Sequence, residues 1–147
     1  MTRLLVDTSV LIKWFHEEGE GELAEARAVR DRHVEGDLDA HVLDLAVYEV
    51  GNVLSRGLGW RADQVADQLD DLIAIVGPPL AMAQPWLRDA ARLAAAHGLS
   101  FYDASWAAAA GALRIPLVSA DQRLLAGGLA LSPAAIVSRL SRGRGTP

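Results

Sequence analysis

The sequence predicts one three-layer α/β/α domain, in which helices cover both faces of a central parallel sheet of about five short strands. The chain has 147 residues, the length of one domain, and 51% of them are hydrophobic. Short apolar runs alternate with longer segments of helical spacing along the whole sequence, which favours parallel strands joined by right-handed crossovers. We expect the domain to cover residues 1–140 and a flexible Arg- and Gly-rich tail to cover residues 141–147.

The first half of the chain is expected to form two strands and three helices. Short apolar runs predict buried strands over residues 3–7 and 39–43. The polar run Asp7-Thr8-Ser9 separates the first strand from a helix that begins near Val10. Apolar side chains three and four positions apart predict further helices over residues 22–34 and 44–57, with Asp44 as an N-cap.

The second half repeats this alternation. We expect a helix over residues 62–75, closed by Gly77-Pro78-Pro79, and a third strand over 80–83. Further helices are expected over 86–96 and 100–113, followed by a fourth strand over 117–118. A short helix over 121–125, a fifth strand over 129–131 and a last helix over 133–140 complete the prediction.

Composition limits the classes of function. The chain has no cysteine, so any metal must be bound by oxygen or imidazole, and a reducing cytoplasm fits this. The first residues lack the apolar stretch of a signal peptide, and no segment has the length of a membrane span, so a soluble, cytoplasmic protein is expected. A net charge of −5 argues against binding nucleic acid mainly through a basic surface.

Four acidic residues are expected at the carboxyl edge of the sheet, where ligands bind in folds of this kind. Asp7 follows the first strand, and Asp121 follows the fourth. Glu49 and Asp103 lie in the opening turns of helices, and these helices start at the same edge because a crossover helix runs antiparallel to its strand. All four carboxylates are therefore predicted to face one cleft.

Such a cleft predicts a metal site. Glu49 lies on an otherwise apolar helix, where burial of an unpaired charge costs several kcal/mol. Four carboxylates in one cleft repel each other, and a hard divalent cation, Mg²⁺ or Mn²⁺, is the usual solution. One or two such ions would hold a phosphodiester and lower the pKa of a bound water. The hydroxyls of Thr8, Ser9 and Ser119 are expected either to orient that water or to cap turns.

Each acidic residue also has a purely structural interpretation. Asp7 and Asp121 match helix N-caps, which are worth roughly 1 kcal/mol each. Ser100 with Asp103 matches the capping-box pattern. Glu49 alone would be satisfied by a nearby arginine. The common position of the four at one edge favours a shared site, because unrelated caps have no reason to meet an acidic helix residue there.

Two other residue types carry no such pattern. The histidines lack metal-ligand spacing and are expected at the surface or at helix ends: His16, His33, His41 and His97. The tryptophans are scattered and are expected in the core or at an interface rather than on a base-stacking platform: Trp14, Trp60, Trp86 and Trp106.

The motifs together resemble the PIN-domain family, most closely its VapC-type toxins. They are Asp7-Thr8-Ser9 after an N-terminal strand, Glu49-Val50-Gly51-Asn52-Val53-Leu54 on a helix, Tyr102-Asp103-Ala104 opening another helix, and Ser119-Ala120-Asp121 after a late strand. The match runs in order along nearly the whole chain. Each tripeptide is weak, whereas four in this order form a fairly specific signature.

This resemblance implies a Mg²⁺- or Mn²⁺-dependent endoribonuclease that is the toxin of a toxin–antitoxin pair. It implies that Asp7, Glu49, Asp103 and Asp121 form the acidic site, and that RNA is the substrate. It further implies a cognate antitoxin that neutralises the enzyme by placing a basic side chain near this site, and a homodimer or a larger hetero-oligomer with the antitoxin. No departure from the pattern occurs at the four acidic positions.

Other classes fit less well. A phosphoryl-accepting receiver domain needs an acidic pair after the first strand and a lysine after the last, but Asp7 stands alone and the only lysine is Lys13. A haloacid-dehalogenase-like phosphatase needs an aspartate where Ser9 stands, and aspartic proteases are all-β. No glycine-rich phosphate loop follows a strand. A non-catalytic dimeric binding scaffold with the same fold remains the alternative, and the intact carboxylate set argues against it.

Overall fold

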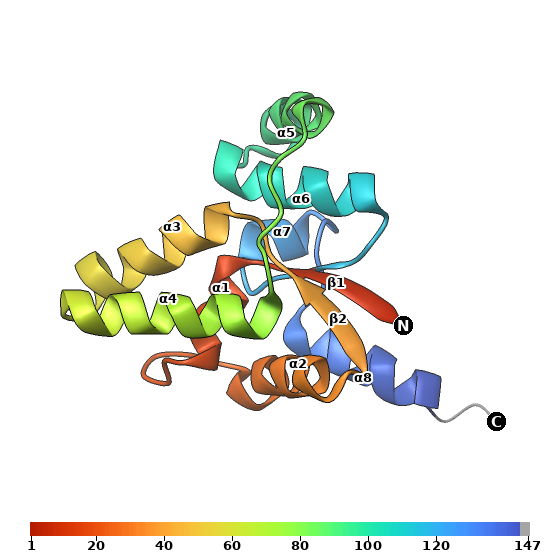
Figure 1. The fold of residues 1–147 in the computed structure, drawn as a ribbon. Helices are drawn as coiled ribbons and strands as arrows, with labels where there is room; N and C mark the ends of the chain where they lie inside the picture. The colour runs from red at the N-terminus through yellow and green to blue at the C-terminus, as the bar shows by residue number, and fades with distance from the viewer. Residues whose placement is uncertain (145–147) are drawn as a thin grey trace.

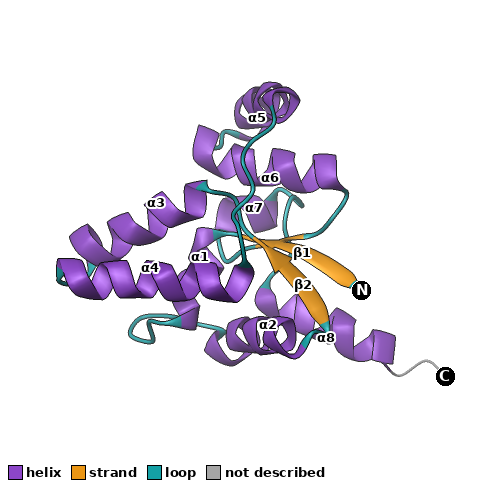
Figure 2. Ribbon diagram, viewed as in Figure 1, coloured by secondary structure: helices purple, strands orange, loops and turns teal. Residues whose placement is uncertain are grey.

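Three short parallel strands lie at the centre of the molecule (Figure 2). In the computed structural model, which describes residues 1–144, β1 (Thr2–Val6) lies between β2 (Leu38–His41) and β3 (Leu117–Val118). Leu4 pairs with Ala40 on one side of β1, and Leu5 pairs with Leu117 on the other. The order β2-β1-β3 places the carboxyl ends of β1 and β3 side by side.

The expected count of about five strands is wrong, because two of the segments contribute only one residue each to the sheet in the described residues. Leu80 forms a single parallel bridge with Leu43, and Leu131 forms one with Val118. The prolines at 78, 79 and 85 enclose the first segment, and Pro133 follows the second. Proline has no N–H to donate to a ladder, so Pro78 blocks extension of the first bridge toward the N-terminus and Pro133 blocks extension of the second toward the C-terminus.

Eight α-helices surround the sheet within residues 1–144. They are α1 (Thr8–Leu11), α2 (Leu23–Glu35), α3 (Leu45–Asn52), α4 (Ala62–Val76), α5 (Gln84–His97), α6 (Phe101–Leu113), α7 (Gln122–Ala126) and α8 (Pro133–Arg144). A 3₁₀ turn over Ile12–Trp14 follows α1, and a π-helical turn over Val53–Gly57 follows α3. No helix in this part of the chain has both the length and the apolar character needed to cross a membrane.

The largest difference in helix bounds is at the C-terminus. The sequence predicts that the last helix ends at Leu140, but α8 continues to Arg144. The helix therefore includes residues 141–144, the first four residues of the expected tail. The remaining residues of that segment, 145–147, lie outside the described residues.

The helices form layers on either side of the sheet (Figure 1). α2 packs against β2 and α8 on one face, whereas α6 packs against β3 and carries α5 on its outer side. Every residue of α6 from Ala104 to Ala110 is buried. This helix is alanine-rich because it is covered on both sides, and small side chains let the sheet and α5 approach it closely.

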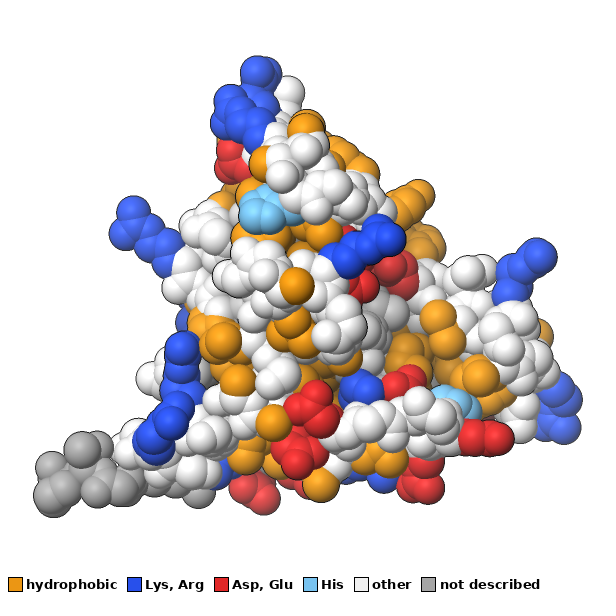
Figure 3. Space-filling model, turned by 180° about the vertical axis from the view of Figure 1, so that it is seen from behind, with side chains coloured by type: hydrophobic (Ala, Val, Ile, Leu, Met, Phe, Trp, Pro, Cys, Tyr) orange, Lys and Arg blue, Asp and Glu red, His pale blue; other side chains and the backbone are white. Residues whose placement is uncertain are grey.

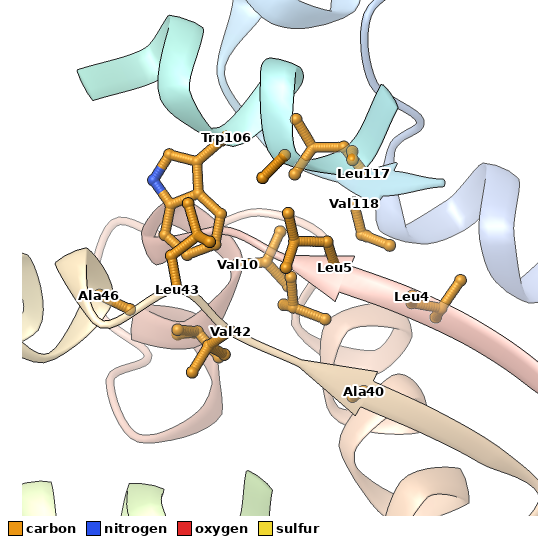
Figure 4. Packing of buried hydrophobic residues seen from close by; sticks show 14 of the residues in the cluster. Leu4, Leu5, Val10, Ala40, Val42, Leu43, Ala46, Trp106, Leu117 and Val118 are labelled. Atoms are coloured by element: carbon orange, nitrogen blue, oxygen red, sulfur yellow. The ribbon is translucent and has the colours of Figure 1, made fainter. Parts of the chain in front are cut away.

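The hydrophobic core lies between β1 and the helices around it (Figure 4). Leu4, Leu5 and Val6 of β1 have no exposed surface. The indole of Trp106 lies over Leu43, and its nitrogen is directed away from Leu5. The indole N–H of Trp106 therefore points away from the core residues of β1, toward the carboxyl edge of the sheet.

Candidate active site

Asp7 lies at the carboxyl end of β1 and caps α1, where its Oδ1 accepts a hydrogen bond from the N–H of Val10. The side chain is 4% exposed. Ser9 Oγ donates to Oδ1 at 2.6 Å, and Ser119 Oγ donates to Oδ2 at 2.5 Å. Both oxygens of this buried carboxylate are therefore held by hydroxyl groups, one from each of the two neighbouring strand ends.

The two serines are fixed from behind by the loop after β3. The N–H of Ala120 donates to Ser9 Oγ at 2.9 Å, and the N–H of Asp121 donates to Ser119 Oγ at 3.0 Å. Each hydroxyl thus accepts a backbone N–H and directs its own proton to Asp7. The loops after β1 and β3 form one hydrogen-bonded unit.

Glu49 joins this unit from α3. Thr8 Oγ1 donates to Glu49 Oε1 at 3.0 Å, and Trp106 Nε1 donates to the same oxygen at 3.2 Å. The residues that satisfy Glu49 are therefore a hydroxyl and an indole rather than an arginine. Because both donors use Oε1, the second carboxylate oxygen keeps its lone pairs for another ligand.

Asp103 and Asp121 are both partly exposed. Asp103 lies in the first turn of α6, where its N–H donates to the N-cap Ser100 Oγ at 3.1 Å. Asp121 caps α7 by accepting hydrogen bonds from the N–H groups of Arg123 and Leu124. The structural and functional interpretations of these aspartates are therefore compatible, since the same turns that need a cap also bring the carboxylates to one edge.

Electrostatics link the four acidic residues through Asp103. The pKa of Asp7 is raised to about 6, mainly by burial and to a smaller extent by the charge of Asp103, against the opposing effect of its hydrogen bonds. Burial also raises the pKa of Glu49, again with a contribution from Asp103. The pKa of Asp103 itself is raised by burial and by Asp121. Asp103 is thus the shared neighbour of the other three.

The chemistry of this donor set fits a hard divalent cation. All four groups offer oxygen, three of them ionise less readily than usual, and a cation near Asp103 would relieve their repulsion. Within residues 1–144, no three acidic or histidine side chains are arranged so that they could hold a metal ion on their own. Mg²⁺ commonly binds one or two carboxylates and keeps several waters, so the set fits an open site rather than a closed cage.

Two residues near this site were not singled out by sequence reasoning. Trp106 was expected only in the core or at an interface, yet it also donates to Glu49. Arg123 lies close enough to lower the pKa of Asp103. Asp103 and Trp106 are three positions apart on one helix, so they lie on the same face. This spacing could have predicted from the sequence that the Trp106 indole lies near the acidic residues. On the face seen in Figure 3, a basic side chain lies against acidic ones below the uppermost helices.

Comparison with known proteins decides the family. The sequence matches the PIN domain over residues 4–127, a span that includes all four acidic residues. The chain belongs to the PIN-domain family. Ribonuclease VapC3 of Pyrobaculum aerophilum is 34% identical to this PIN domain over 127 residues, which cover 83% of this chain and 92% of that protein.

Solved structures agree with this assignment. The crystal structure of PAE2754 from Pyrobaculum aerophilum superposes on this PIN domain with a TM-score of 0.70 at 27% identity, covering 96% of this chain and 90% of that one. A toxin–antitoxin complex from Klebsiella pneumoniae contains a chain with a TM-score of 0.65 at 17% identity, with coverage of 88% and 97%. The predicted α/β fold and the resemblance to PIN domains are confirmed.

Proposed function

We propose that this PIN domain is an endoribonuclease that depends on Mg²⁺ or Mn²⁺, with Asp7, Glu49, Asp103 and Asp121 as its acidic site. The observation that carries the proposal is the grouping of three carboxylates with raised pKa values, all linked through Asp103. The relative named as a ribonuclease, which matches 83% of the chain, supports the same activity.

We assign a different role to each acidic residue according to its contacts and its exposure. Asp7 is the rigid member, because two serines and a backbone N–H fix its oxygens. Glu49 is oriented by Thr8 and Trp106, which leave one oxygen for the site. A bound Mg²⁺ would polarise the phosphodiester and lower the pKa of the attacking water. Asp103 and Asp121 are partly exposed, whereas Asp7 is buried, so they complete the site on the side from which substrate and water enter.

We further propose that the protein acts as the toxin of a toxin–antitoxin pair. The Klebsiella pneumoniae structure of the same fold is a toxin–antitoxin complex, which supports such a partner. A basic side chain of the antitoxin, placed among the carboxylates, would satisfy their charge and compete with the cation. A homodimer, or a larger assembly with the antitoxin, is the proposed form of the protein in the cell.

The test is cleavage of total RNA by the purified chain, produced with and without the product of its neighbouring gene, in Mg²⁺, Mn²⁺ or EDTA. Loss of a residue that only orients a metal ligand costs roughly 10–100-fold in affinity or activity. Asp7→Asn and Asp103→Asn should therefore each reduce metal-dependent cleavage by at least about that factor. Asp67→Asn, an exposed aspartate on α4, is the matched control and should cleave like the unaltered chain.

Two outcomes would overturn parts of this proposal. Full activity of folded Asp7→Asn and Asp103→Asn would remove these residues from the site and point to a contaminating nuclease. Absence of cleavage in any metal, from folded protein free of antitoxin, would favour the non-catalytic scaffold. Neutralisation is tested separately, by adding the purified neighbour to an active sample and measuring the loss of cleavage.

A further inference from the structure

An open pocket of about 600 Å³ adjoins the candidate active site. Ser9 and Asp121 belong to both, so whatever enters the pocket lies next to the carboxylates. This volume is in the range of pockets that hold a small organic ligand. Its lining residues are Ser9, Ile12, Lys13, Glu20, Val53, Ala120, Asp121, Gln122 and Arg123.

The pocket lining includes a partly buried ion pair. The side chain of Lys13 is 6% exposed, and its Nζ donates at 2.8 Å both to Glu20 Oε2 and to the carbonyl of Gly21. The charges of Lys13 and Glu20 cancel, and the pair ties the loop before α2 to the 3₁₀ turn. This ion pair therefore gives the pocket a fixed shape without adding net charge.

Arg123 is a second cation in the pocket lining. Arg123 is exposed on α7, and within residues 1–144 its guanidinium forms no hydrogen bond or salt bridge. The group lies close enough to Asp103 to favour the ionised form of that carboxyl. Arg123 thus lines the pocket, lies near one carboxylate of the site, and has guanidinium donors that no hydrogen bond within residues 1–144 occupies.

We propose that this pocket binds one unpaired nucleotide of RNA next to the scissile bond and that Arg123 binds the phosphate of that nucleotide. The proposal rests on the ribonuclease function proposed above. Ile12 and Val53 offer an apolar surface to a base, and the Gln122 amide can pair with its polar edge. A guanidinium matches the geometry of a phosphate. Bases inside a duplex are stacked and cannot enter a pocket, so the nucleotide must be single-stranded.

The first test removes the cation. Binding of a short, labelled single-stranded RNA is measured by fluorescence anisotropy in EDTA, where no cleavage occurs, over a series of salt concentrations. Arg123→Gln should weaken binding by about three- to tenfold and make the plot of log affinity against log salt shallower by about 0.7, the value for one lost phosphate contact on a single strand. Arg88→Gln, an exposed arginine on α5, is the matched control and should leave both quantities unchanged.

The second test places an anion in the pocket without changing its shape. Gln122→Glu, at the first position of α7, should weaken binding of the single strand more than binding of an RNA duplex of the same length, because only the unpaired base enters the pocket. Gln84→Glu is the matched control, because Gln84 is also exposed at the first position of a helix and lies on α5, outside the pocket lining.

The outcomes separate this inference from the ribonuclease proposal. If Arg123→Gln alters the affinity for Mn²⁺ while the salt dependence of RNA binding stays the same, Arg123 acts only on the carboxylates and the pocket proposal is wrong. Equal sensitivity of duplex and single strand to Gln122→Glu would also overturn it. Failure of the ribonuclease proposal shows itself differently, as absence of metal-dependent cleavage by the unaltered chain.

Discussion

At Asp7, burial and hydrogen bonding shift the pKa of the carboxyl group in opposite directions. Two hydroxyls and a backbone N–H favour the ionised carboxylate, yet burial outweighs them and raises its pKa to about 6. Desolvation penalises the charged form whatever the neighbouring dipoles do, and only an added cation would reverse the balance. The metal-free protein therefore keeps a carboxylate that is costly to ionise.

This shift predicts how the stability of the metal-free protein depends on pH. Asp7 titrates near 3.8 when unfolded and near 6 when folded, so the folded state binds more protons in that window. The free energy of unfolding should therefore fall by about 3 kcal/mol in total as pH rises from about 3 to about 7 and then level off. Urea unfolding in EDTA across this range measures it, and the raised pKa values of Glu49 and Asp103 act in the same direction.

Asp7→Asn tests the cause of that dependence. The variant removes the buried charge, so it should flatten the pH profile and raise the free energy of unfolding near pH 7.5 by about 2 kcal/mol, although it loses activity. The gain is below the full 3 kcal/mol because an amide nitrogen cannot accept one of the serine protons. An unchanged pH profile in Asp7→Asn would show that another group causes it. Asp67→Asn, an exposed aspartate, should retain the profile of the parent chain.

Trp106 combines a core position with a polar contact to the site. It is 2% exposed, and its indole N–H donates to Glu49. Trp106→Phe keeps an aromatic ring but removes the donor, so we expect weaker Mn²⁺ binding, by about three- to tenfold, and a further rise in the pKa of Glu49. Calorimetric titration with Mn²⁺ measures the affinity independently of activity.

A second buried tryptophan supplies the control for this prediction. Trp14 is 4% exposed, and its indole N–H donates at 3.0 Å to the backbone carbonyl of Ala26 rather than to one of the four acidic residues. Trp14→Phe should lower the free energy of unfolding by a similar amount, about 1–3 kcal/mol, but leave Mn²⁺ affinity unchanged. Equal Mn²⁺ affinities for the two variants would show that Trp106 contributes only to packing.

Thr8→Val, which removes the other donor to Glu49, should weaken Mn²⁺ binding without leaving a cavity.

At the level of the elements, the turns after β1 and β3 each perform two tasks. Asp7 caps α1 and Asp121 caps α7, so each helix gains the acceptor that its first N–H groups need. The same two turns exchange hydrogen bonds through Ser9 and Ser119. The carboxylates are therefore positioned by the elements themselves, and no long flexible loop has to order to bring these two together.

His33 lies in the last turn of α2, as expected for a helix-end histidine, and its ring also connects this helix to two other elements. The N–H of Ala40 in β2 donates to His33 Nδ1 at 3.0 Å, and the ring Nε2 lies 2.6 Å from the carbonyl of Ile75 in α4. Because Nδ1 accepts, the proton of the neutral ring lies on Nε2, which donates to the carbonyl. The histidine thus satisfies a group of the strand and a carbonyl in the last turn of a helix, where no partner exists within the helix.

His33→Leu should therefore destabilise the protein without affecting its chemistry. The change leaves one N–H and one carbonyl without partners, and each costs about 1–3 kcal/mol when buried. We expect the free energy of unfolding in urea to fall by about 2–4 kcal/mol, while Mn²⁺ affinity stays the same. His16→Leu is the control, since the His16 side chain has no hydrogen bond within residues 1–144. A loss of less than about 0.5 kcal/mol in His33→Leu would show that water replaces the ring.

For the whole molecule, the charge of the acidic edge affects the free energy of unfolding. The chain has a net charge of −5, and the carboxylates at this edge lower its stability by repulsion and burial. A cation that binds only the folded state stabilises it by mass action, by about 2.7 kcal/mol at a concentration one hundred times its Kd. Mn²⁺ should therefore raise the melting temperature of the unaltered chain, and EDTA should reverse the shift.

Asp103→Asn identifies the site responsible for this shift. Asp103 is the shared neighbour of the other carboxylates, so its replacement should raise the melting temperature in EDTA and reduce the further increase caused by Mn²⁺. Thermal unfolding followed by circular dichroism, with and without Mn²⁺, measures both changes. An Mn²⁺ shift as large in Asp103→Asn as in the parent chain would place the cation elsewhere on the protein.

The sequence accounts well for the fold and for the residues at its carboxyl edge. Alternating apolar runs and helical spacing predict the order of elements, because burial imposes a period of two on strands and about 3.6 on helices. The prediction fails at the two outer strands, where Leu80 and Leu131 form single bridges. An apolar run does not show how many backbone N–H groups find partners, and this depends on the path that prolines impose.

What the sequence by itself determined is the set of chemical groups and the edge at which they lie. A strand must end where its apolar run ends, so Asp7 and Asp121 fall at one edge once the strands are parallel. Only the tertiary structure decided which groups hold them. Ser119 donates to Asp7 across 112 positions of sequence, and Trp106 donates to Glu49 across 57. Such contacts arise from packing between distant segments, and so do the desolvation that raises their pKa values and the pocket beside them.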